Sequence, residues 1–215
     1  MNILKFILDR TIIHVSRGNK ITDSGCKIKQ SKVRIKGTDN NVYIGKNTTI
    51  RKCEFSIKGR NNTVIIGDQC DFTNTKILID NVNGVINIGA HTSIAGAMIV
   101  SFEPHDIIIG EDCMISYDVE IRNTDSHKII SIETGDRINP GKPIFIENHV
   151  WLGARSTILK GSNIGTNSIV GTNSIVGTNS VVTGGKMPKN SIIAGQPARV
   201  IRNGISWNRE SVIPE

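Results

Sequence analysis

The chain has few aromatic side chains, which make up only 4% of its 215 residues. Its core therefore cannot be a conventional globule packed around Phe, Tyr and Trp. Ile, Val and Gly must supply it, as they do in stacked coils. No apolar run reaches transmembrane length. The first apolar stretch, residues 3–8, is broken by Lys5 and lacks a small-residue cleavage site, so no secretory signal is predicted.

Cysteine is scarce, and none of its four positions forms a C-x-x-C pair. Neither a zinc site nor a redox motif is therefore predicted. Cys70 and Cys113 follow Ile-Gly pairs at a small inward position, where they fit best as buried, reduced thiols. We expect a cytoplasmic protein without a metal cofactor.

Acidic residues are outnumbered by basic ones, 19 to 26, which gives a formal net charge of +7. This excess favours an anionic partner, such as a nucleotide-containing cofactor, an acidic polymer or a membrane surface. No helix-turn-helix, zinc-finger or RNP-type signature is present, so we do not expect a nucleic-acid partner. Simple solubility is an equally good explanation of the charge.

What the sequence does have is a six-residue repeat between residues 146 and 182. Its branched aliphatic positions are Ile146, Leu152, Ile158, Ile164, Val170, Val176 and Val182. Gly often follows the aliphatic residue, and Asn or Ser stands three or four places after it. A period of six matches neither a helix nor an open strand, but it matches short strands separated by corners. Hexapeptide repeats of this kind predict an all-β fold, a parallel β-helix.

A looser form of the repeat extends toward the N-terminus. Ile-Gly pairs begin at residues 44, 66, 88 and 109, so each early coil should carry three or four residues more than three hexads. We expect a β-helix domain over 21–183, interrupted by an insertion at about 122–143, with a C-terminal cap and tail over 184–215. Residues 1–20 should form an appendage that either caps the first coil or touches a membrane surface.

The insertion holds the best candidate for chemistry, because His127 lies outside the repeat and close to Asp125. A neutral imidazole has the intrinsic pKa of a general base, although a surface loop histidine is an equally simple interpretation. His91 and His149 stand where other repeats have Asn or Asp, which predicts corner residues. His105, His127 and His149 are 22 residues apart but differ in register, so they should not converge on a metal.

From Asn123 to Ile201 the chain resembles the hexapeptide-repeat acyltransferases, a left-handed β-helix family. The motifs that carry the resemblance are Asp125-Ser126-His127, Gly141-Lys142-Pro143-Ile144, Val150-Trp151-Leu152-Gly153, Ile158-Leu159-Lys160-Gly161, Gly171 to Ser174, Ser180-Val181-Val182-Thr183, and Ala194 to Ile201. Within the family, the DSHKI loop followed by Trp151 is similar to the members that O-acetylate sialic-acid capsules.

The resemblance implies a homotrimer that binds acetyl-CoA in the groove between neighbouring β-helices. It implies that His127 is the general base, oriented by Asp125 or Asn123, and that Trp151 lies beside the acetyl group. Gly153, Ala154, Gly171 and Thr172 would line the pantetheine arm, since small residues permit close approach of the backbone. Lys186 and Arg199 would contact phosphates, although Gly184-Gly185 precedes Lys186 where the family has Lys directly after the VVT motif.

These implications predict an acetyl-CoA-dependent O-acetyltransferase acting on an anionic bacterial surface polysaccharide, a sialic-acid-containing capsule. Transfer would be direct, without a covalent enzyme intermediate. It would take place in the cytoplasm, or at the inner face of the cytoplasmic membrane if residues 1–20 touch lipid. Two alternatives stay open: an acetyltransferase for a free sugar, nucleotide-sugar or antibiotic, and a non-catalytic β-helix that binds carbohydrate.

Overall fold

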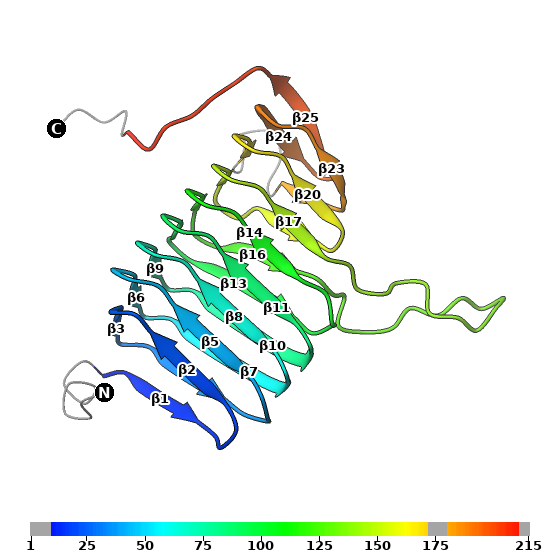
Figure 1. The fold of residues 1–215 in the computed structure, drawn as a ribbon. Helices are drawn as coiled ribbons and strands as arrows, with labels where there is room; N and C mark the ends of the chain where they lie inside the picture. The colour runs from blue at the N-terminus through cyan, green and yellow to red at the C-terminus, as the bar shows by residue number, and fades with distance from the viewer. Residues whose placement is uncertain (1–9, 172–179, 211–215) are drawn as a thin grey trace.

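The chain winds into a solenoid of three parallel sheets, seen in a computed structural model that describes residues 10–171 and 180–210 (Figure 1). Each coil contributes one strand to each sheet, so neighbouring strands in a sheet come from successive coils. This architecture confirms the predicted left-handed parallel β-helix. No helix in the described part of the chain is long and apolar enough to cross a membrane.

The three sheets form three faces, which we name A, B and C in chain order. Face A consists of β1 (Ile12–Val15), β4 (Lys32–Ile35), β7 (Glu54–Arg60), β10 (Lys76–Val82), β13 (Ala97–Ser101), β16 (Val119–Arg122), β19 (Thr157–Leu159) and β22 (Val181–Val182). Face B consists of β2 (Lys20–Asp23), β5 (Asn41–Ile44), β8 (Thr63–Ile66), β11 (Val85–Ile88), β14 (Ile107–Ile109), β17 (Ile144–Ile146), β20 (Ser162–Ile164) and β23 (Gly185–Met187).

Face C consists of β3 (Lys27–Lys29), β6 (Thr49–Arg51), β9 (Asp71–Thr73), β12 (Ser93–Ile94), β15 (Met114–Ile115), β18 (Trp151–Leu152), β21 (Ile169–Val170), β24 (Ser191–Gly195) and β25 (Ala198–Asn203). All pairings along this face are parallel except that of β25, which returns antiparallel on β24. We call the three lines of corners edge AB, edge BC and edge CA, after the faces that they join.

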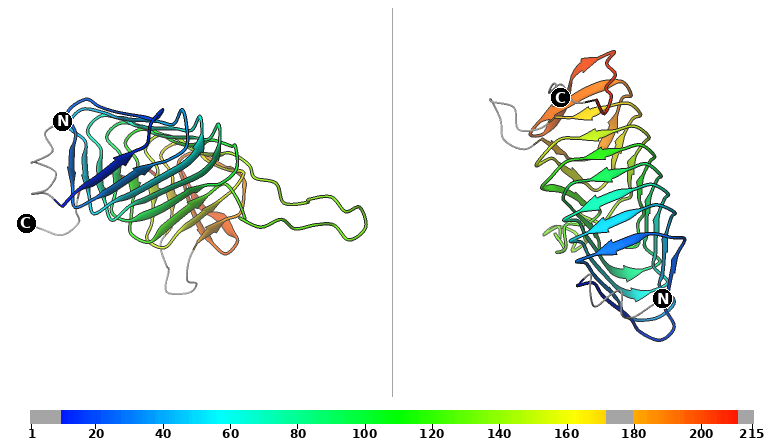
Figure 2. Two further views of the ribbon diagram at one scale, coloured as in Figure 1. Left: turned by 90° about the horizontal axis from the view of Figure 1, so that it is seen from below. Right: turned by 90° about the vertical axis from the view of Figure 1, so that its left-hand side faces the viewer.

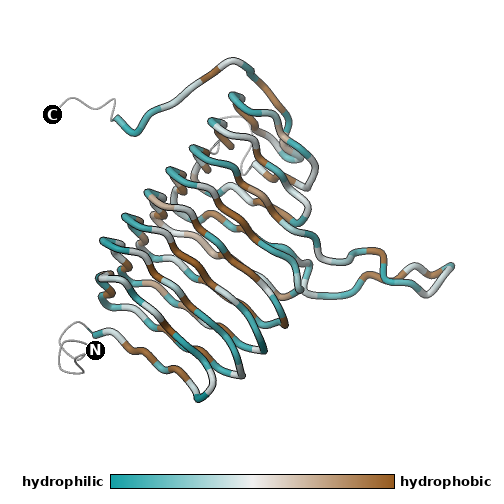
Figure 3. Tube along the Cα trace, in the orientation of Figure 1, coloured by the Kyte–Doolittle hydropathy of each residue, from teal (hydrophilic) through white to brown (hydrophobic). Residues whose placement is uncertain are grey.

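The interior is a stack of aliphatic side chains, one from each repeat position. Ile109, Ile115, Ile121 and Ile146 are each no more than 1% exposed, and their counterparts in the central coils are buried as well. Figure 3 shows apolar and polar residues alternating along the strands, with polar residues at the corners. Cys70 and Cys113 are buried in this core, as predicted.

The corners along edge BC share one unusual backbone conformation. The non-glycine residues with positive φ there are Asn47, Gln69, His91, Asp112, His149, Asn167 and Asn190, all between 53° and 60°. Short polar residues and His reach this region at lower cost than branched ones. The prediction that His91 and His149 are corner residues is confirmed. Because coils stack about 4.8 Å apart, side chains at equivalent corners of adjacent coils are in contact.

Edge AB is where the early coils carry their extra residues. Asn40 and Asn62 are fully buried there, and Asn62 donates to the side chain of Asn40 at 2.9 Å. The Asn62 side chain also donates to the carbonyls of Lys58 and Asn81 and accepts from the Gly84 amide. The ladder satisfies backbone groups that the wider corner removes from the sheets.

The ends of the solenoid extend beyond the expected domain limits. Strand β1 starts at Ile12 and pairs with β4, within the stretch expected to be an appendage. At the other end, β23 and β24 continue faces B and C beyond residue 183. The segment between β16 and β17, which holds the predicted insertion, projects from edge AB as a long hairpin-like loop (Figures 1 and 2).

Candidate functional site

The projecting loop is anchored to the solenoid by Glu103, a residue of edge AB. Arg137 donates to both carboxylate oxygens of Glu103 at 2.8 Å, and the Gly141 amide and the Thr124 hydroxyl donate to it as well. The bonds from Arg137 lower the pKa of Glu103 from 4.5 to about 2, with further help from Gly141 and Thr124. One ionised carboxylate therefore joins both ends of the loop to the preceding coil.

A second set of contacts fixes the backbone around His127. Asn139, which is 8% exposed, donates to the His127 carbonyl at 2.9 Å and to Asp125 Oδ2 at 2.8 Å. Lys160 donates to the same Asp125 oxygen and to the Asn139 carbonyl. The bond from Lys160 contributes most to lowering the pKa of Asp125. The imidazole of His127 itself is exposed at the surface of the loop.

The two residues expected to orient His127 differ in where their side chains lie. Asn123 is fully buried, and its amide donates to Ser101, to the Glu103 carbonyl and to the His105 carbonyl. Its side-chain oxygen accepts from the Phe102 amide, so the structure does not bring it to the imidazole. Asp125 is nearer, since its carbonyl accepts from the His127 amide at 2.8 Å.

Trp151 lies at the start of β18, with its half-buried indole on the outer side of face C. Along this face it pairs with Met114 in the preceding coil and with Ile169 in the next. Its indole N–H donates to the Ser116 hydroxyl at 3.3 Å. The indole of Trp207, from the C-terminal segment, lies 6.1 Å from it.

Most of the residues expected to bind the cofactor lie in one column. Gly153 and Gly171 stand at edge CA of successive coils, and their amides donate to the carbonyls of the next coils. Ala154 follows Gly153 and is buried. In the next coil Ala194 approaches Gly171 and pairs with Arg199, an exposed residue of β25.

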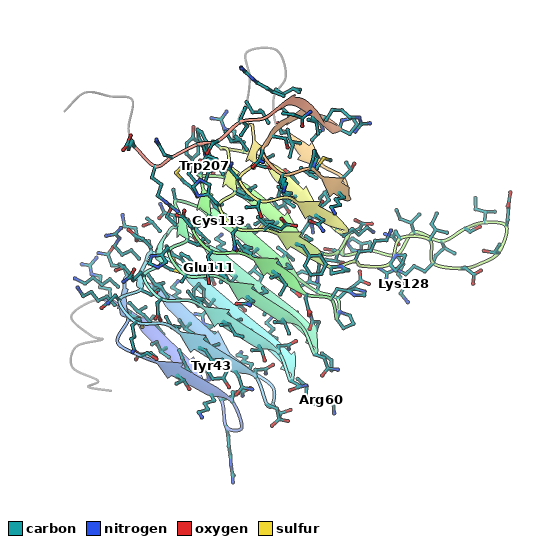
Figure 4. The ribbon with its side chains drawn as sticks, turned by 45° about the horizontal axis from the view of Figure 1, so that its top comes forward. Tyr43, Arg60, Glu111, Cys113, Lys128 and Trp207 are labelled. Atoms are coloured by element: carbon teal, nitrogen blue, oxygen red, sulfur yellow. The ribbon has the colours of Figure 1, made fainter. Side chains whose placement is uncertain are left out.

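Lys186 and Thr172 are not part of this column. Lys186 lies on β23 of face B and pairs with Asn163. Thr172 lies outside the described residues. In addition, the loop with His127 belongs to edge AB, whereas Trp151 is on face C and the Gly column is on edge CA. Figure 4 shows Lys128 in the loop and Trp207 of the C-terminal segment on different sides of the solenoid. A single chain therefore does not assemble the predicted residues around one point.

Sequence reasoning missed the carboxylate that holds the loop and the cluster beside Trp151. The residues of this cluster are Asp112, His149, Trp207 and Arg209. His149 Nδ1 lies 2.7 Å from Asp112 Oδ2, as expected for equivalent corners of adjacent coils. The stacking of Trp207 on His149, with ring centroids 4.1 Å apart, joins positions 58 residues apart and has no signal in the repeat.

Comparison with characterised proteins gives consistent relatives. No family model matches the chain. A polysialic acid O-acetyltransferase of Neisseria meningitidis is 53% identical over 74 residues, which is 34% of either chain. One of Escherichia coli O1:K1 / APEC is 40% identical over 122 residues, which is 57% of this chain and 38% of the relative. The aligned regions thus span little more than a third of these curated relatives.

Solved structures match over nearly the whole chain. The polysialic acid O-acetyltransferase OatWY is 34% identical with a TM-score of 0.78, covering 94% of this chain and 89% of that one. The polySia-specific acetyltransferase NeuO is 30% identical with a TM-score of 0.70, covering 95% and 92%.

Proposed function

The chain belongs to the family of the polysialic acid O-acetyltransferases, and we propose that it transfers acetyl from acetyl-CoA to a hydroxyl of polysialic acid. The observation that carries the proposal is the near-complete structural match at 34% identity to an enzyme of that activity. The column of small residues at edge CA supports it, because Gly and Ala leave room for a pantetheine arm against the backbone.

In the proposed reaction, His127 removes the proton of the sugar hydroxyl as its oxygen attacks the thioester carbonyl. The tetrahedral intermediate collapses with cleavage of the C–S bond, and the imidazolium returns its proton to the CoA thiolate. Backbone N–H groups at a corner stabilise the oxyanion. Trp151 lies beside the acetyl group, and Asp125 fixes the backbone from which His127 extends.

The separation of these groups within one chain supports a site completed by a second copy. The projecting loop carries exposed isoleucines at Ile129, Ile130, Ile132 and Ile138, with exposed fractions from 47% to 102%. A loop of this apolarity is stabilised by docking on another surface. We propose that it reaches a neighbouring subunit of a homotrimer and brings His127 to the partner subunit's copies of Trp151 and the Gly column.

The distribution of charge supports a polyanionic acceptor over a small one. Residues 10–60 contain 13 Lys and Arg against three Asp and Glu, whereas residues 61–215 contain 12 against 15. The first coils therefore hold an excess of ten positive charges. Exposed Lys29, Lys32 and Lys52 gather at edge CA, four to five coils, or about 19 to 24 Å, from Gly153. We propose that these coils hold an extended acidic polymer along the edge that leads to the transfer site.

The test of the activity is acetyl transfer from acetyl-CoA to sialic-acid polymers, oligomers and monomer, followed by thiol release and mass spectrometry. We expect transfer to the polymer, and a loss of about 100-fold or more in kcat for His127→Ala. His14→Ala, an exposed histidine of β1, is the matched control. Thiol release that survives in His127→Ala contradicts the general base, and no release with any acceptor favours a carbohydrate-binding scaffold.

The acceptor class has a separate test. In Lys29→Glu and Lys52→Glu variants, the KM for polymer should rise and its salt dependence should weaken, while the KM for acetyl-CoA stays unchanged. Lys189→Glu, an exposed lysine of the last coils, is the control. Equal transfer to monomer and polymer, without a salt effect, supports the alternative of a free-sugar acceptor.

A further inference from the structure

The C-terminal segment 204–210, which we call the strap, runs back along the solenoid after β25 ends at Asn203. The Ile205 amide donates to the Asn190 carbonyl, and the Ile205 carbonyl accepts from the Asn167 side chain. Further along, the strap contacts the corners of His149 and Asp112. Its contacts therefore cross successive coils of edge BC in the reverse of chain order.

Arg209 clamps the far end of the strap. Its guanidinium donates to Asp112 Oδ1, the Ser93 hydroxyl and the Cys113 carbonyl, each at 2.8 Å, and to the His91 carbonyl at 3.1 Å. A charged donor with this many short bonds holds its segment more firmly than neutral contacts do. The bond to Arg209, together with that to His149, lowers the pKa of Asp112 against the effect of burial.

Between these two attachments the strap seats Trp207 beside Trp151. The Trp207 ring stacks on His149 with an interplanar angle of 13°, and its indole N–H donates to the His149 carbonyl at 2.9 Å. His149 Nε2 lies 3.0 Å from the Trp207 carbonyl. The two indoles are tilted by 48° at 6.1 Å between centroids, a geometry that aromatic pairs favour.

We propose that Trp207 is a positioning residue for the acetyl-transfer site, an inference that rests on the proposed function. The Trp151 indole donates to Ser116 and lies beside Trp207, while the residue stays partly exposed. Without the second indole, Trp151 gains rotamers that lie off the acetyl group. The strap thus fixes one wall of the donor pocket, and the Arg209 clamp holds that wall in place.

The chain offers a direct readout because it contains only two tryptophans. In both Trp207→Ala and Trp207→Phe, all tryptophan fluorescence comes from Trp151. We expect acrylamide to quench Trp151 more readily in Trp207→Ala than in Trp207→Phe. In acetyl-transfer assays, Trp207→Ala should lose about tenfold or more in kcat/KM for acetyl-CoA, and Trp207→Phe should recover most of it.

Two further variants separate positioning from simple stability. Arg209→Ala releases the clamp without touching Trp151, and it should raise quenching by acrylamide in a Trp207→Phe background. Asn208→Ala, whose exposed side chain bonds to Glu210 within the strap, should change neither quenching nor kinetics. Thermal unfolding of each variant confirms that the solenoid is intact.

Equal quenching and equal kcat/KM in Trp207→Ala and Trp207→Phe overturn the proposal. If the wild-type protein transfers no acetyl group, the proposed function fails, yet the quenching comparison still decides whether the strap holds Trp151. If quenching rises while kcat/KM is unchanged, Trp207 orders Trp151 without serving the reaction, and the proposed role is wrong.

Discussion

Replacing Glu103 with Gln should loosen the loop that carries His127. The side chain is 17% exposed and that of Arg137 27%, so solvent screens the pair only partly. A pKa lowered from 4.5 to about 2 corresponds to roughly 3 kcal/mol at 1.36 kcal/mol per unit. Since Gln keeps one acceptor oxygen, we expect the free energy of loop opening to fall by about 2 kcal/mol.

The sign of the pH dependence follows from the lowered pKa. Ionised Glu103 stabilises the folded loop fully above pH 4.5, and this contribution is lost as the pH falls toward about 2. The wild-type loop should therefore open progressively over that interval. In the Glu103→Gln variant the loop is already loosened at pH 7, so its opening should not increase over this pH interval.

Hydrogen exchange of the amides at 128–139 measures the opening directly, and acetyl transfer at pH 7 reports its effect on His127. A drop of about 2 kcal/mol means roughly 30-fold faster exchange when the loop opens and closes rapidly relative to the chemical exchange step. Glu111→Gln is the control, because Glu111 is an exposed carboxylate of edge BC, across the solenoid from the loop (Figure 4). Unchanged exchange in Glu103→Gln, or the same acid response in both proteins, refutes the assigned anchor.

Three other predictions concern the solenoid itself. Asn62→Ala removes the acceptor of the Gly84 amide and a donor to two carbonyls in the interior, and it should lower the free energy of unfolding by about 3 kcal/mol in urea titrations. Gly67→Ala sets a Cβ 2.5 Å from the Ala90 amide nitrogen and should destabilise by about 1–3 kcal/mol in thermal unfolding, whereas Gly96→Ala, with 3.5 Å of clearance, should be tolerated. Burial raises the pKa of Cys113 to about 11, so a thiol reagent at pH 8 should modify it only after the protein is unfolded.

The sequence was informative wherever a feature repeats with the coil. The hexad aliphatics predicted the interior, and the lapse between Ile121 and Ile146 predicted the projecting loop, because a missing repeat leaves no strand to stack. The spacing of 22 between Asn40 and Asn62 is visible in the sequence, but only the structure shows that the side chains point inward and bond to each other.

Contacts outside the repeat could not be predicted in this way. Glu103 meets Arg137 across 34 residues, and Trp207 meets His149 across 58. Neither contact follows the coil repeat, so the periodicity of the sequence does not reveal it. The C-terminal segment follows edge BC because of the direction in which the chain leaves β25, and no repeat in the sequence specifies that direction.

The constant rise between coils fixes the distances between sites along the solenoid axis. Each coil adds about 4.8 Å along the axis, while the direction in which each edge faces is kept. The distance between the basic first coils and Gly153 along edge CA is therefore a whole number of coil spacings. Duplicating residues 62–83, one 22-residue unit, lengthens that distance by one coil and should shift the preferred acceptor toward longer chains.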